Sequence, residues 1–255
     1  MFKIVHKNDK VSTYIAEKIK SKLSMFDTDS QEIVISVGGD GTILRAIHEN
    51  KDRIEDIVIF GVRTGHLGFF MDFKEEMIDE MLKSIENRTY NVHSFNLAEA
   101  TVHTNGTTKP FIALNEFQIV KSHRVVVFDM LIDGRKFETF RGNGLCFSTP
   151  AGSTGMNKSL RGAIVDPLLE AIQVTELASI NSNAYRTIGS PLILSKGRKL
   201  SLVTETPIKL DFCYDHKMET FHDVHKLTFK LSNKKVKIAY IKDNPFFERV
   251  RKAFI

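Results

Sequence analysis

One acid in a glycine-rich segment, Asp40 within Gly38-Gly39-Asp40-Gly41-Thr42, is the side chain of this sequence best suited to chemistry. The segment follows a β-branched apolar run at residues 33–37 and precedes apolar residues at helical spacing, so the pattern predicts a strand, a loop and a helix. Without Cβ atoms, backbone N–H groups of the loop can approach phosphate oxygens at the helix N-terminus. A carboxylate among such amides is costly unless it handles a metal ion or a reacting hydroxyl, so the loop indicates phosphoryl transfer. A hairpin turn at Asp40-Gly41 is the alternative, which the change of period from strand to helix disfavours.

A second glycine-rich segment, residues 61–70, follows the next predicted strand at residues 57–62. Loops after neighbouring parallel strands lie at the same edge of a sheet, so we expect the two loops to face one crevice. Phe69 and Phe70 could stack on a base there. Core packing is the alternative for Phe69 and for its neighbour Phe70.

Two polar residues, Asn115 and Glu116, interrupt an apolar run at residues 111–120 that predicts a strand. Adjacent strand residues point to opposite faces, so at most one of the two is easily solvated. A buried Asn or Glu needs a hydrogen-bond partner, and a ligand hydroxyl or amide is one candidate.

Residues 140–158 combine Arg141 with glycines and several hydroxyl side chains. The segment could be a long loop and nothing else, or its Thr154, Asn157 and Ser159 could hydrogen-bond to a base or an amide. Its Gly-Ser-Thr-Gly spacing differs from the G-x-S-x-G pattern of a nucleophile elbow, which disfavours a hydrolase.

The cysteines and histidines predict neither a disulfide framework nor a metal site. Cys146 and Cys213 stand alone without a C-x-x-C pattern, so we expect a reducing compartment. His222 and His225 fall on opposite faces of a predicted strand. His216, in a polar turn, is typical of a surface residue on composition alone.

The elements that must position these residues begin with an alternation of strands and helices. The order βαβαβ implies a parallel sheet with right-handed crossovers. The predicted strands are residues 2–6, 33–37 and 57–62, and the predicted helices are residues 11–23, from the glycine loop to about 51, and 74–86.

From about residue 94 the pattern becomes that of strands, with Asn105-Gly106 and Asp133-Gly134 as turn signals. Asp166-Pro167 resembles an N-cap and a first helical residue, and predicts a helix at residues 168–177. We predict an α/β domain at residues 1–93, a β-rich domain at 94–242, and a C-terminal helix at 243–255 that joins the first domain. Strands of the second domain are expected at residues 97–103, 111–120, 124–132, 136–140 and between 191 and about 241.

Composition is that of a soluble globular protein, with 255 residues, 42% hydrophobic and 26% charged. The formal net charge of +5 suits phosphate-bearing ligands, and no motif supports nucleic-acid binding. The first ten residues lack the apolar core of a signal peptide, and no run of about 18 apolar residues occurs. We therefore expect a cytoplasmic protein without membrane attachment.

Taken together, three segments resemble the NAD kinase family in its bacterial form. They are the glycine loop at residues 38–42, the pair Asn115-Glu116, and the glycine–serine–threonine loop at residues 152–156. The resemblance runs along essentially the whole chain. It implies a Rossmann-like N-terminal domain, a β-rich C-terminal domain, and ATP- and Mg²⁺-dependent phosphorylation of the adenosine 2′-hydroxyl of NAD to NADP. Family members are dimers or, commonly, tetramers, so it also implies a homo-oligomer, with a tetramer expected.

The resemblance also implies roles for individual residues. Asp40 would be the general base. Asn115 and Glu116 would hold adenosine, and Tyr185 would lie near a neighbouring subunit's site. The phosphate loop would include Gly38, Gly39 and Thr42, and the other substrate-binding residues would be Gly41, Arg45, Arg141, Asn143, Thr154, Gly155, Met156, Asn157, Lys158, Ser159, Ala178 and His216. Phe69 joins the expected substrate-binding residues because of its place in the second glycine-rich segment.

Two departures and two rival functions accompany this resemblance. The family usually has aspartate at Asn143 and alanine–tyrosine at Gly155-Met156, so this chain lacks one charge and one aromatic ring in the expected pocket. A lipid kinase of the diacylglycerol type shares the glycine loop, but the sequence has no exposed amphipathic membrane helix. A non-catalytic NAD(H)-binding regulator is the other rival, and the intact Asp40 argues against it. ATP and polyphosphate are both candidate phosphoryl donors.

Overall fold

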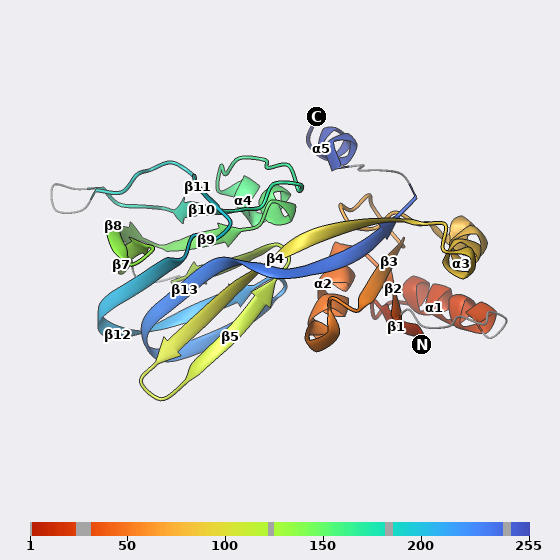
Figure 1. Ribbon diagram of the computed structural model, residues 1–255, viewed down its shortest axis with the longest axis horizontal. Helices are drawn as coiled ribbons and strands as arrows, with labels where there is room; N and C mark the ends of the chain where they lie inside the picture. Colours follow the sequence, from red (N-terminus) through yellow and green to blue (C-terminus); the bar gives the residue numbers. More distant parts are fainter. Residues whose placement is uncertain (1, 24–31, 122–124, 182–185, 242–245) are drawn as a thin grey trace. The chain divides into compact units, whose positions relative to one another are not determined.

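The computed structural model describes residues 2–23, 32–121, 125–181, 186–241 and 246–255 (Figure 1). It contains two compact units. The first comprises Met1–Phe95 with Lys234–Ile255, and the second comprises Asn96–Asn233. The long strands β4 (Asn91–Thr104) and β13 (Lys217–Tyr240) contribute residues to both units.

A parallel sheet forms the centre of the first unit. Strand β1 (Phe2–His6) pairs with β2 (Glu32–Gly38), β2 pairs with β3 (Ile57–Arg63), and β3 pairs with the end of β13, all in parallel. Helix α1 (Lys10–Leu23) connects β1 to β2, and α2 (Asp40–Glu49) connects β2 to β3. The predicted βαβαβ order is therefore confirmed. Apolar side chains of β2 and β3 are buried because helices cover a parallel sheet.

Shorter elements complete the first unit. A 3₁₀ helix, η1 (Lys51–Arg53), follows α2, and η2 (Glu75–Met77) leads into α3 (Ile78–Asn87), which buries an apolar stripe against the sheet. The predicted helix at 74–86 thus begins with a 3₁₀ turn. The predicted C-terminal helix is α5 (Phe246–Phe254).

Antiparallel strands dominate the second unit, as predicted. Strand β12 (Leu200–Tyr214) pairs with β13, β6 (Glu116–Val120) and β7 (Val126–Ile132). Strand β9 (Gly144–Ser148) lies between β6 and β10 (Ala171–Leu177), and β10 also pairs with β11 (Leu192–Ser195). The two turn signals each close a hairpin, between β4 and β5 (Thr108–Ala113) and between β7 and β8 (Arg135–Gly142). Stacked phenylalanine rings fill the core, with the Phe147 and Phe229 centroids 3.7 Å apart.

Two sequence-based expectations for the second unit are wrong. Residues 171–177 form β10 and not a helix, because this β-branched run pairs with a strand on each side, β9 and β11. Asp166 lies in a turn, and its Oδ1 accepts a hydrogen bond from Leu168 N at 3.0 Å. The run 111–120 is two strands, β5 and β6, broken at Leu114-Asn115. Of the two alternatives for residues 140–158, a long loop alone does not hold, since the segment includes the fully buried β9, a 3₁₀ helix η3 (Ala151–Thr154) and most of a short helix α4 (Met156–Ser159).

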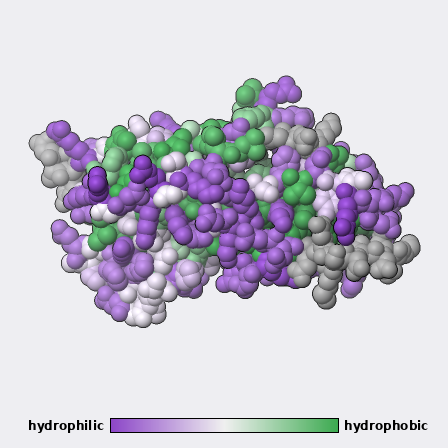
Figure 2. Space-filling model, in the orientation of Figure 1, coloured by the Kyte–Doolittle hydropathy of each residue, from purple (hydrophilic) through white to green (hydrophobic). Residues whose placement is uncertain are grey.

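Side chains on the face drawn in Figure 2 are largely hydrophilic, with small hydrophobic patches between them. One such patch covers α5, where Phe247, Phe254 and Ile255 are exposed. Among the described residues, none of the helices has the length and apolar character needed to cross a membrane.

Candidate active site

Asp40 occupies the first position of α2, and one residue, Gly39, separates it from the end of β2. Gly39 is the N-cap, its N–H donates to Thr42 Oγ1 at 3.4 Å, and its carbonyl accepts from Thr42 N at 2.8 Å. Gly38 has a φ of +153°, and a Cβ there would lie 2.3 Å from Thr42 Oγ1, so this tight turn requires glycine. The turn places Asp40 at the positive end of a helix, where a negative charge is favoured.

The second glycine loop supplies hydrogen bonds to this carboxylate. Phe69 N donates to Asp40 Oδ2 at 2.7 Å, and Phe70 N donates to Oδ1 at 3.0 Å. A Cβ on Gly68 would lie 2.3 Å from Oδ1, so glycine is required for the loop to approach. The structure thus brings the two glycine loops together at the C-terminal ends of β2 and β3, as expected from the parallel order.

The pKa of Asp40 is raised above its ordinary value because burial disfavours the charged form. The amides of Phe69 and Phe70 oppose this rise, and the charge of Arg249 opposes it to a smaller extent. A carboxylate with a raised pKa that is still held by donors is suited to accept a proton from a hydroxyl group.

Other residues of the predicted phosphate site lie around this carboxylate in different ways. Gly41 is exposed on the first turn of α2. Arg45 is half-buried, and its guanidinium group donates a hydrogen bond to the carbonyl of His6. Its Nε lies 3.7 Å from Glu49 Oε1. The Phe69 ring packs against Phe246 and Phe254 of α5, with centroids 5.9 and 6.0 Å away. The roles predicted for Arg45 in phosphate contact and for Phe69 in base stacking stay predictions.

In the second unit, Asp215 binds the backbone at the break between β5 and β6. Its carboxylate accepts from Leu114 N at 3.0 Å and from Asn115 N at 2.8 Å. Thr149 N donates to the Asn115 carbonyl at 2.9 Å, and a Cβ on Gly152 would lie 2.1 Å from that same oxygen. The residues around Asn115 therefore form a closely packed bend and not a continuous strand.

Among the described residues, two acceptor atoms at this bend have no protein partner. Asn115 Oδ1 and Glu116 Oε2 are buried and have no hydrogen-bond partner in the described part of the chain. Gln118 Nε2 donates to the other oxygen of Glu116 at 3.3 Å. Burial and, secondarily, the negative charge of Asp215 raise the pKa of Glu116 to about 7. Two buried acceptors suit a ligand that brings hydroxyl or amine donors.

The loop at residues 152–159 lies beside Glu116. A Cβ on Gly155 would be 3.1 Å from Glu116 Oε2, and Met156 is 42% exposed. Asn157 is fully buried: Nδ2 donates to the carbonyls of Ser153 and Ala163, and Oδ1 accepts from Thr175 Oγ1 at 2.7 Å. Its hydrogen bonds thus stabilise the loop, and its predicted role in binding stays a prediction. Of the other predicted residues of this loop, Thr154 is half-buried, and Lys158 and Ser159 are exposed.

A further group of predicted residues lies where β8 and β10 end. Asn143 N donates to the Leu177 carbonyl at 3.0 Å, and Ile180 N donates to the Arg141 carbonyl at 2.8 Å. Ala178 has a φ of +46° and follows directly after β10. These contacts bring Arg141, Asn143 and Ala178 together. His216 is exposed in the turn between β12 and β13, and Tyr185 lies outside the described residues.

Gly68, Asp215 and Arg249 take part in these arrangements although sequence reasoning did not select them. Gly68 carried a signal as one of the glycines in the second loop. Asp215 carried a weaker one, as an acid in a turn. Arg249 lies three residues after Phe246 in the C-terminal helix, and no local sequence pattern distinguishes it.

No group of three or more His, Cys, Asp or Glu that could hold a metal ion occurs among the described residues. Cys146 and Cys213 are both outside disulfides.

The parallel α/β unit with a carboxylate in its glycine loop, together with the β-rich unit, defines the two-part fold of a nucleotide-phosphorylating kinase. Family models agree with this class: the ATP-NAD kinase N-terminal domain matches residues 2–90, and the ATP-NAD kinase C-terminal domain matches residues 114–240. The chain belongs to the NAD kinase family.

Relatives and solved structures agree with this assignment. The chain is 39% identical over 260 residues to NAD kinase 1 of Bacillus subtilis (strain 168), covering 100% of this chain and 98% of the relative. It is 40% identical over 261 residues to the NAD kinase of Geobacillus stearothermophilus, covering 100% and 96%. Yeast NADH kinase complexed with NADH superposes with a TM-score of 0.83 at 17% identity, covering 98% of this chain and 86% of that one. The NAD kinase from Archaeoglobus fulgidus in complex with ATP gives 0.75 at 24% identity and 98% coverage of both chains. At these identities the likeness to the two structures is one of fold.

Proposed function

We propose that this chain transfers the terminal phosphoryl group of ATP to the adenosine 2′-hydroxyl of NAD, giving NADP and ADP, with Asp40 as the general base. One observation carries the proposal. Asp40 is the acid of the glycine loop, at a helix N-terminus, with each carboxylate oxygen on a backbone N–H group. That arrangement holds the carboxylate in one orientation and still leaves a lone pair on each oxygen for a substrate hydroxyl.

The chemistry asked of Asp40 is modest. The 2′-oxygen forms a bond to the γ-phosphorus while the bond from that phosphorus to the β–γ bridging oxygen breaks, and the hydroxyl proton passes to Asp40. The transition state of such transfers is loose in most analyses, so the hydroxyl need not lose its proton first. Asp40 orients the hydroxyl and accepts the proton late, which contributes a factor of roughly 10²–10⁴ to the rate.

In this proposal Mg²⁺ binds together with ATP. Mg²⁺ is usually held by one or two carboxylates together with substrate phosphates and water. When bound, the ion neutralises charge on the donor phosphates, and polyphosphate is the alternative donor with the same chemistry.

The bend at Asn115-Glu116 is the proposed site for the adenosine part of NAD. Its two acceptor atoms, which have no partner in the part of the chain that the structure describes, would take hydrogen bonds from ribose hydroxyls or from the adenine amine. The residues at the ends of β8 and β10 and the loop at 154–159 would line the rest of the dinucleotide site. Tyr185 and His216 belong to the same proposal, with Tyr185 near a neighbouring subunit of a homotetramer. A cytoplasmic location is also proposed, because two cysteines outside disulfides fit a reducing compartment.

Purified protein with NAD, ATP and Mg²⁺ is expected to form NADP, measured by an enzymatic cycling assay. Asp40→Asn is expected to lower kcat by about 10² or more and to leave the NAD dissociation constant nearly unchanged, since it keeps the shape of the side chain and removes the base. Asp52→Asn, at an exposed acid in η1, is the matched control. NAD binding without NADP formation under several donors would favour the regulator, and phosphorylation of a lipid alcohol would favour the lipid kinase.

A further inference from the structure

The peptide group that joins Phe69 to Phe70 has both of its polar atoms engaged. Its N–H, on Phe70, donates to Asp40 Oδ1 at 3.0 Å. Its carbonyl oxygen, on Phe69, accepts from Tyr240 Oη at 3.2 Å and from a guanidinium nitrogen of Arg249. The proposed base is therefore connected through a single peptide group to a cation on the C-terminal helix.

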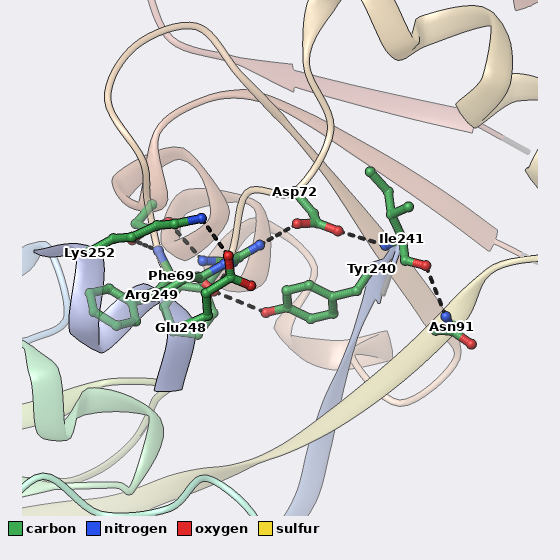
Figure 3. Close-up of polar contacts among 10 residues, drawn as sticks. Phe69, Asp72, Asn91, Tyr240, Ile241, Glu248, Arg249 and Lys252 are labelled. Carbon is green, nitrogen blue, oxygen red and sulfur yellow. Dashed lines mark hydrogen bonds and ion pairs between the residues drawn. The ribbon is translucent and has the colours of Figure 1, made fainter. Parts of the chain in front are cut away.

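Arg249 is held in place on several sides, as Figure 3 shows. It is 4% exposed, and its second guanidinium nitrogen forms an ion pair with Asp72 Oδ1. Asp72 Oδ2 accepts in turn from Ile241 N at 2.6 Å. The guanidinium carbon also lies 5.1 Å from the centre of the Tyr240 ring. A buried, paired and stacked arginine has little freedom, so it fixes the position of the carbonyl that it contacts.

The chemistry of the contact suggests more than packing. A hydrogen bond from a charged donor is roughly twice as strong as a neutral one, and successive hydrogen bonds polarise each other. A donor on the Phe69 carbonyl therefore makes the Phe70 N–H a better donor to Asp40. Without this donor, the loop that carries the N–H groups of Phe69 and Phe70 loses the hydrogen bond that fixes its Phe69 carbonyl, on the side away from Asp40.

We propose that Arg249 is a positioning residue for phosphoryl transfer, which acts with Tyr240 through the Phe69–Phe70 peptide group to hold the Asp40 carboxylate. This inference rests on the proposed function, because it takes Asp40 as the base. It assigns the C-terminal helix a part in the reaction, although its anchoring residue lies 209 positions after Asp40 in the chain (249 − 40).

Steady-state kinetics of three variants test this role. Arg249→Met keeps the length of the side chain and removes its charge and hydrogen bonds, and it is expected to lower kcat by about 10- to 100-fold, since small displacements of catalytic groups cost this much. The KM and the calorimetric dissociation constant for NAD should stay within about twofold, because the proposed adenosine contacts belong to other residues. Arg249→Lys should recover part of the loss, and Arg251→Met, at an exposed arginine of the same helix, should behave as the wild type. Wild-type kcat in Arg249→Met would overturn the inference.

A double-mutant comparison separates positioning of Asp40 from general destabilisation. In the Asp40→Asn background, Arg249→Met should cause little further loss of kcat, because the group through which it acts is already gone. A full additional 10- to 100-fold loss would show that Arg249 acts elsewhere and would overturn the inference. Wild-type turnover by Asp40→Asn alone would instead overturn the proposed role of Asp40, which is a different result.

Tyr240→Phe covers the case in which Arg249→Met does not fold. It removes one hydroxyl from the same carbonyl and leaves every charge in place. We expect kcat to fall about two- to fivefold, with an unchanged NAD dissociation constant and an unchanged melting temperature. Unchanged kcat in both Tyr240→Phe and Arg249→Lys would overturn the inference.

Discussion

The pH dependence of stability at Glu116 offers a quantitative test of the bend in the second unit. Glu116 is 7% exposed, and one of its oxygens lacks a protein partner within the described residues. Burial first, and the charge of Asp215 second, raise its pKa from 4.5 to about 7. Between these two values the native state keeps the proton that the unfolded state has released, so the native state binds more protons. The free energy of unfolding therefore decreases as pH rises from about 4.5 to about 7, and the contribution is constant above that range.

The expected magnitude follows from the same interval. At about 1.36 kcal/mol per pH unit, the difference between 4.5 and about 7 corresponds to roughly 3 kcal/mol. Glu116→Gln keeps the size of the side chain and cannot ionise, so the variant should lack this decrease. The stability of the variant minus that of the wild type should rise by up to about 3 kcal/mol between pH 4.5 and pH 8. A constant difference in stability between variant and wild type at pH 4.5 reflects the replacement of a carboxyl by an amide. It does not change how that difference depends on pH.

Urea denaturation of both proteins at half-unit steps from pH 4.5 to pH 8.5 measures this difference. Ile119→Val is the matched control, because it shortens a buried side chain of the same strand without changing a titrating group. It should cost about 0.5–1.5 kcal/mol at every pH. A flat difference for Glu116→Gln would refute the reasoning, since it would mean that Glu116 is as well solvated in the native state as in the unfolded one.

Three further predictions concern the site and the assembly. Gly68→Ala should lower kcat by about tenfold or more, because the new Cβ would lie 2.3 Å from Asp40 Oδ1. Steady-state kinetics measure this effect, with Gly65→Ala as the control because a Cβ at Gly65 meets nothing within 4 Å. Equal activities of the two variants would contradict the prediction. Met156→Tyr should tighten NAD binding about fivefold, measured by calorimetry, since base stacking exceeds a methionine contact by about 1 kcal/mol. The double variant Met156→Tyr with Gly155→Ala should lose part of that gain, because the new Cβ at residue 155 would lie 3.1 Å from Glu116 Oε2. Light scattering of the purified protein should give the mass of a homo-oligomer, with a tetramer expected, and a fully active monomer would rule out a shared site.

Local patterns in the sequence predicted the elements whose signals are local. The change of hydrophobic period around Asp40 identified β2, the glycine turn and α2, because strand and helix periods differ over a few residues. The alternation of strands and helices then implied a parallel sheet, and with it the meeting of the two glycine loops at one edge. Turn residues marked the hairpins at 105–106 and 133–134 for the same reason, since their backbone conformation depends on a few adjacent side chains.

Only the tertiary structure decided which partners these elements found. Residues 171–177 follow a helix-like start signal at Asp166-Pro167 and yet form a strand, because pairing with β9 and β11 outweighs a local cap. The bend at Asn115 depends on Asp215, a hundred residues away, and a single-sequence pattern does not reveal that contact. Local patterns did not single out Arg249, because its contact is with a loop 180 residues earlier in the chain. The sequence alone therefore predicted a chemical role for the loop at Asp40, whereas the fold determined what holds that carboxylate, since hydrogen bonds between distant segments exist only once the chain has packed.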